Sequence, residues 1–207
     1  IAIMFDRVLL TIAKPIARVI YPLRVIGREN IPKKGGFIIC GNHTALLDPV
    51  FLLLTCPRRI YFMAKEELMK KGIAKWFFKK FHVFTIKRGA GDIESVNYAI
   101  DLVEKGEILG IFPEGKRSKD YTPQNAKAGI ALIAHTAKAD ILPAGIYAKG
   151  RIKPFKLTTG RYGELIKYED LGMSEAGGRS EYKAASAKIM NEIKYLWGMG
   201  HEKNTPC

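Results

Sequence analysis

The sequence lacks any long hydrophobic run and contains only three cysteines in 207 residues. No uninterrupted apolar stretch approaches the roughly 20 residues that a helix needs to span a bilayer. Cys40, Cys56 and Cys207 form no C-x-x-C pair and no zinc-ligand spacing, so no metal or redox cofactor is implied. Cys40 and Cys56 lie in apolar surroundings, which is typical of reduced core residues in a cytosolic protein.

Acidic residues are scarce relative to basic ones. Lys and Arg number 34 against 20 Asp and Glu, which leaves a formal net charge of +14. Such an excess suits an anionic partner: nucleic acid, an anionic membrane surface or a phosphorylated substrate. A solvated basic surface has the same composition, so charge alone does not separate these possibilities. With 47% hydrophobic and 26% charged residues, the chain is typical of one globular domain with an appendage.

Residues 1–20 show the pattern of an amphipathic helix, in which Pro15 is expected to introduce a kink or a break. Four polar, mainly basic residues recur at helical spacing on one face: Arg7, Thr11, Lys14 and Arg18. A basic face opposite a wide apolar face is typical of a helix in a membrane interface, although a helix packed on its own domain has a similar pattern. We expect membrane-interface helices over 1–26 and a globular domain over 27–207.

From Gly36 onward, short apolar runs alternate with helical patterns, which favours an α/β layer architecture. The expected strands cover 37–40, 59–64, 83–86, 108–112 and 141–147. The expected helices cover 49–55, 65–81, 92–105, 126–137 and 179–197. No internal repeat or low-complexity tract interrupts this order.

A polar pair, His43 and Asp48, lies between two apolar runs at 37–40 and 50–54. Histidine accepts protons near neutral pH, and a carboxylate on its far nitrogen sets the tautomer and stabilises the imidazolium. The pair therefore predicts a proton-abstracting site at the end of a buried strand. A structural histidine, with Asp48 capping a helix that begins at Pro49, is the alternative that these residues leave open.

Polar clusters follow three of the expected strands. They are His43 with Asp48, Lys87 with Arg88, and Glu114 with Lys116 and Arg117. Because ligands bind beyond the strand ends of open α/β sheets, we expect the clusters to converge on one site. Cations there would hold a phosphate or offset a developing oxyanion. Taken singly, each cluster is also typical of a solvated turn.

Two other functions are disfavoured by the chemistry of these segments. Residues 110–116 match most of a phosphate-binding P-loop, but Pro113 has no N–H to offer and Glu114 would repel the phosphates. A hydrolase with Ser118 or Cys40 as nucleophile would lack the G-x-S-x-G turn, and Cys40 is expected inside a strand. A histidine base needs no protein nucleophile.

Four blocks of the sequence match a known family in order and spacing. They are Asn42-His43-x-x-x-x-Asp48, Phe84-Thr85-Ile86-Lys87-Arg88, Phe112-Pro113-Glu114-Gly115-Lys116-Arg117-Ser118 and Ile141-Leu142-Pro143-Ala144-Gly145. The chain resembles the glycerolipid acyltransferases, in particular the bacterial lysophosphatidic acid acyltransferases. The resemblance implies a mixed β-sheet flanked by helices, with an acyl-chain tunnel, preceded by amphipathic helices that seat the domain on a membrane.

The resemblance also implies a role for each block. His43 would be the general base on the acceptor hydroxyl, oriented and charge-balanced by Asp48. The second and third blocks would bind the acceptor, with Arg88 on its phosphate; the substrate-binding positions are Lys87, Arg88, Glu114, Gly115, Lys116, Arg117 and Ser118. Pro143 would line the apolar end of the acyl site. The chain departs from the family at His82, where Gly is common, and at Lys116, where Thr is common.

The implied reaction moves a fatty acyl group from acyl-CoA or acyl-acyl carrier protein to the hydroxyl of lysophosphatidic acid, giving phosphatidic acid. Glycerol 3-phosphate, another lysophospholipid or a lyso-aminolipid are alternative acceptors. The expected location is the cytoplasmic face of the inner membrane, with an anionic membrane surface as partner. A basic binding module without catalysis is the alternative of a different class. Nucleic acid is not expected, because the aromatic residues cluster with apolar residues and not with basic ones.

Overall fold

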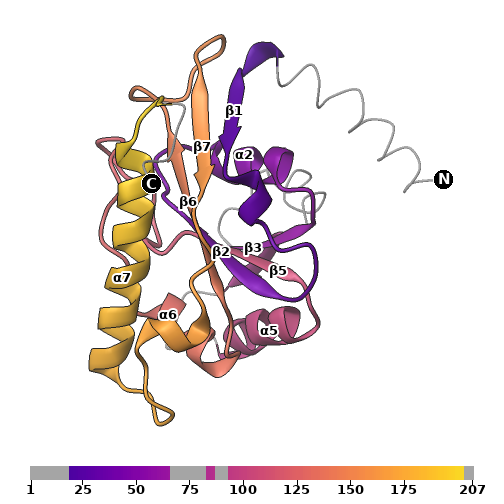
Figure 1. Cartoon of the computed structure of the whole chain (residues 1–207), viewed down its shortest axis with the longest axis vertical. Helices are drawn as coiled ribbons and strands as arrows, with labels where there is room; N and C mark the ends of the chain where they lie inside the picture. The colour runs from indigo at the N-terminus through magenta and orange to yellow at the C-terminus, as the bar shows by residue number, and fades with distance from the viewer. Residues whose placement is uncertain (1–18, 66–82, 87–92, 203–207) are drawn as a thin grey trace, which may run out of the picture.

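The computed structural model describes residues 19–65, 83–86 and 93–202, which form a seven-stranded sheet with helices on both faces (Figure 1). The strands are β1 (Leu23–Ile26), β2 (Phe37–Gly41), β3 (Ile60–Lys65), β4 (Val83–Ile86), β5 (Ile108–Ile111), β6 (Ile141–Tyr147) and β7 (Thr158–Tyr162). The helices are α2 (Asp48–Thr55), α5 (Ile93–Glu104), α6 (Gly129–Thr136) and α7 (Arg179–Gly198), with 3-10 turns η1 (Arg28–Asn30) and η2 (Tyr168–Leu171).

The strand order is β1-β7-β6-β2-β5-β3-β4. Every neighbouring pair is parallel except β6 and β7, which are antiparallel. Strands β2 and β5 pair with Cys40 opposite Ile111, so they end at the same edge of the sheet. The loops that follow these two strands, which contain His43 and Glu114, therefore start side by side.

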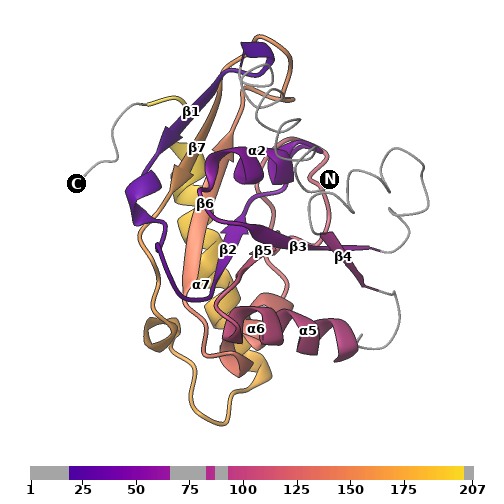
Figure 2. The ribbon, with the colours of Figure 1, turned by 90° about the vertical axis from the view of Figure 1, so that its right-hand side faces the viewer.

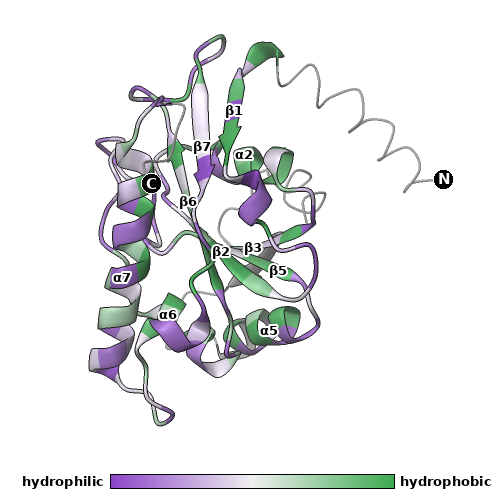
Figure 3. Cartoon of the chain, viewed as in Figure 1, coloured by the Kyte–Doolittle hydropathy of each residue, from purple (hydrophilic) through white to green (hydrophobic). Residues whose placement is uncertain are grey.

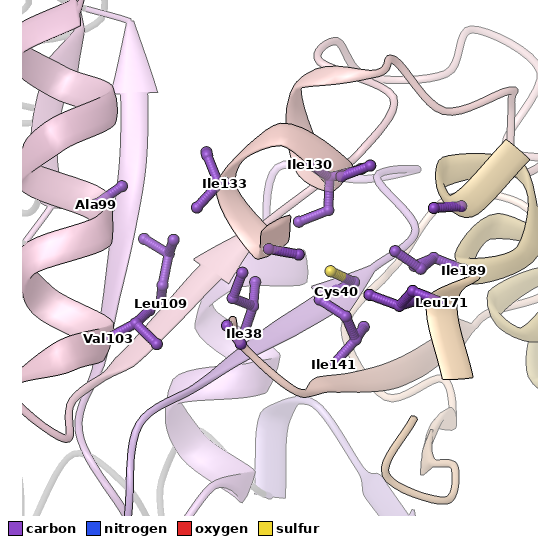
Figure 4. Packing of buried hydrophobic residues seen from close by; sticks show 14 of the residues in the cluster. Ile38, Cys40, Ala99, Val103, Leu109, Ile130, Ile133, Ile141, Leu171 and Ile189 are labelled. Atoms are coloured by element: carbon purple, nitrogen blue, oxygen red, sulfur yellow. The ribbon is translucent and has the colours of Figure 1, made fainter. Parts of the chain in front are cut away.

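Strand β2 lies at the centre and is buried along its whole length. Ile38 and Cys40 contribute to a core shared with α5, α6 and α7 (Figure 4), whereas Phe37 and Ile39 contribute to a second core shared with α2. Side chains alternate between the two faces of a strand, so a strand covered on both faces has a continuous apolar sequence. Figure 2 shows α2 on the opposite side of the sheet from α7, and Figure 3 shows the apolar colouring of the central strands.

The expected α/β architecture is confirmed, and five strands and four helices occur within a few residues of their expected positions. Helix α6 begins at Gly129, three residues later than expected, because the backbone N–H of Lys127 donates to the carbonyl of Pro113 (2.9 Å) and holds the preceding segment against the β5 loop. The helix expected over 65–81 lies outside the described residues.

Two strands, β1 and β7, were not expected from the sequence. Strand β7 is polar in sequence (Thr-Thr-Gly-Arg-Tyr) but buried throughout, and β1 pairs with it in parallel. The pairing joins segments more than 130 residues apart, which no local pattern reveals. The first strand of the sheet therefore starts at Leu23. Residues 23–26 belong to the α/β domain, whereas the sequence analysis had assigned them to the amino-terminal segment.

The amphipathic segment predicted over 1–20 falls almost wholly outside the described residues, so its helical and interfacial character stays a prediction. In the part of the chain that the structure describes, no helix combines the length and the apolarity required to span a membrane.

Candidate active site

The chain leaves β2 through Asn42, whose fully buried side chain ties this point to strand β6. Its Nδ2 donates to the carbonyl of Ile146 (2.9 Å), and its Oδ1 accepts from the N–H of the same residue (2.7 Å). A buried amide with both ends paired sets the direction of the chain rigidly, because breaking either bond would leave buried polar groups unsatisfied. The next residue, His43, is therefore placed by the sheet itself.

His43 and Asp48 meet as the sequence predicts. His43 Nδ1 lies 3.2 Å from Asp48 Oδ2, and the same oxygen accepts the backbone N–H groups of Thr44 (2.7 Å) and Ala45 (2.6 Å). The Asp48 side chain is fully buried, while that of His43 is 19% exposed. An Nδ1 proton donated to the carboxylate leaves Nε2 with its lone pair as the basic nitrogen.

Asp48 does not cap its own helix, contrary to the alternative that the sequence left open. It is the first residue of α2, the N-cap is Leu47, and no side chain caps that end. The carboxylate turns back to the loop before the helix, where two N–H groups and the imidazole converge on one oxygen. Burial raises the pKa of the Asp48 carboxyl, and the hydrogen bonds from His43 and from the Ala45 and Thr44 N–H groups lower it.

An aromatic stack supports the imidazole from the neighbouring strands. The rings of His43 and Phe112 are stacked at 4.3 Å between centroids, with an interplanar angle of 22°. Phe112 in turn stacks on Phe62 of β3 at 5.8 Å. Phe112 belongs to the third block, but its role in holding the histidine ring was not predicted, because it depends on β5 lying beside β2.

The third block holds the backbone of His43. Glu114 Oε1 accepts the His43 N–H (2.8 Å), and the Ser118 N–H donates to the His43 carbonyl (2.8 Å). Glu114 is 2% exposed and Ser118 is 8% exposed. Burial raises the pKa of the Glu114 carboxyl, while the bond from His43 lowers it. Both residues thus hold the backbone of His43 in the structure, and their expected contact with the acceptor stays a prediction.

The cations of the third block lie at the surface. Lys116 and Arg117 are exposed, and Gly115 adopts a positive φ of 68°, a conformation that favours glycine. Lys127, which the sequence analysis missed, packs on this glycine: a Cβ built at Gly115 would lie 3.2 Å from Lys127 Nζ. Lys127 belongs to none of the four sequence blocks. Its N–H donates to the carbonyl of Pro113, and this contact between separate segments places it beside Gly115.

The remaining predicted residues are the two cations of the second block and Pro143. Lys87 and Arg88 lie outside the described residues, so the convergence of the second block on the site stays a prediction. Pro143 sits within β6 opposite Cys40, and it and Leu196 of α7 would both contact a Cβ at Gly163. Its neighbours in the strand, Leu142 and Ala144, face the α2 side. Pro143 thus packs towards α7, and its expected place in the acyl site stays a prediction.

No group of three or more His, Cys, Asp or Glu side chains in the described segments is arranged to hold a metal ion. The chemistry that the arrangement offers is proton transfer by an oriented imidazole, next to a set of surface cations.

A family model for acyltransferases matches residues 22–147, which contain both the His43 loop and the Glu114 loop. The chain belongs to the acyltransferase family. This confirms the relationship that the four sequence blocks indicated.

Curated relatives agree with the family match. The 1-acyl-sn-glycerol-3-phosphate acyltransferase of Bacillus subtilis (strain 168) is 33% identical over 141 residues, which are 63% of this chain and 70% of that protein. The proteins of the same name from Borreliella burgdorferi and Streptococcus pneumoniae are 31% and 32% identical, over 59% and 56% of this chain. The matches span only 50% and 43% of those two proteins.

A solved structure shares the fold. The 1-acyl-sn-glycerophosphate acyltransferase PlsC of Thermotoga maritima superposes with a TM-score of 0.72 over 97% of this chain and 83% of that chain, at 23% identity. The α/β acyltransferase fold of this chain is therefore shown by structure as well as by sequence.

Proposed function

We propose that this acyltransferase esterifies the free hydroxyl of 1-acyl-sn-glycerol 3-phosphate (lysophosphatidic acid) and forms phosphatidic acid. The observation that carries the proposal is the His43–Asp48 pair, buried on the aspartate side and open on the histidine side, at the edge where β2 and β5 end. The names of the relatives support this acceptor. Acyl-CoA and acyl-acyl carrier protein both fit as the thioester donor.

The mechanism follows from the geometry of the pair. His43 Nε2 takes the proton of the acceptor hydroxyl as the oxygen attacks the thioester carbonyl. The tetrahedral intermediate collapses, the ester forms, and the sulfur leaves with the proton returned by the imidazolium as a free thiol. Asp48 stabilises the imidazolium through Nδ1, and the stack on Phe112 keeps the ring in plane for both transfers. No covalent intermediate with the protein is needed.

The acceptor phosphate would be held by surface cations beside the base. Lys116 and Arg117 are exposed on the loop that binds the His43 backbone, and Lys127 packs on the same loop. Charge-assisted hydrogen bonds from Lys and Arg are well suited to a phosphate. Arg88, expected on this phosphate from the resemblance, completes the proposed set.

We place the reaction at the cytoplasmic face of the inner membrane. The acceptor and its two-chain product are membrane lipids, so the enzyme must reach the interface. The amphipathic pattern of 1–20 and the net charge of +14 support binding to an anionic bilayer surface.

The test is a reconstituted transfer reaction. Purified protein receives lysophosphatidic acid with either donor, free thiol is measured with a chromogenic disulfide, and the lipid product is identified by mass spectrometry. We expect equal amounts of thiol and phosphatidic acid. Release of thiol without phosphatidic acid would identify a thioesterase. A higher rate with glycerol 3-phosphate or another lysolipid would show that this compound, and not lysophosphatidic acid, is the preferred acceptor.

Two histidine variants test the mechanism. His43→Ala should lower turnover by about 10²- to 10⁴-fold, the usual effect of losing a general base. His135→Ala is the matched control, since His135 lies on α6 and contacts Ser174 and Tyr182, away from the pair. Activity of His43→Ala near that of the wild type would rule the mechanism out.

A further inference from the structure

The loop that joins β6 to β7, residues 148–157, has an unusual composition. It carries four cations and no acidic residue; the cations are Lys149, Arg151, Lys153 and Lys156. Lys149, Arg151, Lys153 and Lys156 are all exposed. Elsewhere in the described chain, two lysines have carboxylate partners: Lys105 pairs with Asp101, and Lys167 pairs with Asp140. The loop therefore presents concentrated positive charge at one end of the sheet, with no carboxylate partner among the described residues.

An aromatic side chain stands out from the same loop. Phe155 is 72% exposed and has a φ of 58°, a conformation that bulky residues rarely adopt. Its backbone N–H donates to the carbonyl of Ile20 (2.6 Å), and Thr158 N–H donates to the carbonyl of Pro22 (2.9 Å). These bonds hold the backbone against the chain entering β1, so the phenyl ring projects outward.

The described segment that Phe155 contacts begins with an exposed apolar residue. Val19 is 71% exposed, and among the described residues Phe155 and Val19 are the two most exposed large hydrophobic side chains. Figures 1 and 2 both show the loop before β7 beside the indigo start of the described chain, at the end of the molecule farthest from α5 and α6. Residues 1–18, for which an interfacial helix is expected, lead directly into this point.

We propose that the 148–157 loop and Val19 form a docking surface for an anionic lipid bilayer. Phe155 and Val19 enter the interface, and the four cations bind the lipid phosphates around them. Apolar side chains encircled by basic ones are the combination that interfacial binding requires. A duplex of nucleic acid would use the charge, but it would leave the two apolar side chains in water. The proposal deepens the membrane part of the proposed function and assigns it to residues of the folded domain.

Vesicle binding by the full chain tests the surface without acyl transfer. The probes are vesicles of phosphatidylcholine alone and of phosphatidylcholine with phosphatidylglycerol, measured by co-sedimentation at fixed salt. Phe155→Asn suits the backbone, because Asn tolerates positive φ, and should weaken binding to the anionic vesicles at least about tenfold. Lys153→Gln with Lys156→Gln should weaken it about 25-fold, at roughly fivefold per cation near the surface.

Matched variants on α7 separate the loop from general charge and apolarity. Arg179→Gln with Lys183→Gln removes two exposed cations, and Tyr195→Asn removes a half-exposed aromatic. Both should bind like the wild type. Loop variants that bind anionic vesicles as tightly as the wild type would overturn the proposal. A DNA duplex serves as a second probe. Loop variants that lose binding to the duplex but keep binding to the vesicles would also overturn the proposal and would indicate nucleic acid as the partner.

Enzyme assays distinguish failure of this proposal from failure of the proposed function. With a short-chain lysophosphatidic acid dissolved as monomers, the loop variants should keep the wild-type kcat; with the acceptor in anionic vesicles, their rates should fall in step with binding. Equal loss in both assays would show that the loop acts in the site and not in docking. Loop-dependent vesicle binding by a chain with no acyl transfer would refute the function and leave the docking surface standing.

Discussion

Glu114 offers the sharpest separation between what a family resemblance assigns and what the structure shows. The resemblance places it on the acceptor, whereas the structure buries its carboxylate and directs Oε1 to the backbone N–H of His43. We predict that Glu114 acts by positioning the base. Glu114→Gln keeps an acceptor oxygen for that N–H, and Glu114→Ala removes it.

The size of each effect follows from the bond that is lost. A hydrogen bond between a neutral donor and a charged group contributes about 1.5–3 kcal/mol. If that free energy sets how often His43 is in place, Glu114→Ala should lower kcat by about 10- to 150-fold, at about 1.4 kcal/mol per tenfold. The variant should also melt about 3–12 °C lower, at about 2–4 °C per kcal/mol for a chain of this size. Glu114→Gln keeps a neutral bond, so its kcat should fall no more than about tenfold.

Steady-state kinetics with the acceptor and the donor varied separately measure both consequences. A positioning role predicts lower kcat with little change in the KM for lysophosphatidic acid, and partial rescue in the Gln variant. A rise of more than about tenfold in the acceptor KM, with kcat and melting temperature unchanged, would refute this reasoning and return Glu114 to the acceptor site.

Lys127 and Gly27 provide two further tests outside the motifs. Lys127→Ala should raise the acceptor KM at least about fivefold, because about 1 kcal/mol of phosphate binding is lost, and it should leave the donor KM unchanged. Lys183→Ala, at an exposed position on α7, is the control. An equal rise in the acceptor KM for that variant would contradict a local role of Lys127. Gly27→Ala should destabilise the fold by at least about 1 kcal/mol more than Gly35→Ala in urea unfolding. Both glycines have positive φ (71° and 79°), but of the two only Gly27 is crowded: a Cβ there would lie 2.1 Å from the Tyr162 carbonyl oxygen. Equal urea midpoints for the two variants would contradict this explanation.

Closeness in the sequence explains why the His43–Asp48 pair could be predicted. His43, Asp48 and the turn between them lie within six residues, and the two backbone N–H groups that orient the carboxylate belong to the same turn. Such a site needs only a short loop after a buried strand, and the apolar sequence of β2 predicts that strand. The meeting of the imidazole and the carboxylate was therefore predictable in outline, although the spacing alone did not decide that Asp48 would turn away from its helix.

The supporting contacts were not predictable in the same way. Glu114 is 71 residues from His43, and Ile146 is 104 residues from Asn42. Each contact depends on β2 lying between β5 and β6, an order that no periodicity in one sequence specifies. A single hydrogen bond contributes about 1 kcal/mol and leaves no compositional trace. The bonds of Glu114 and Ser118 to the His43 backbone were not predicted for this reason.

The sequence by itself determined the α/β class, the central buried strand, the acyltransferase family and the identity of the histidine and its aspartate, because hydrophobic period and short motifs are local properties. Only the tertiary structure decided how the base is held, that β1 belongs to the sheet, that Lys127 packs on Gly115, and that a basic loop with an exposed phenylalanine lies beside the chain entering β1. These features join segments far apart in the sequence, and they exist only once strand order and register bring those segments together.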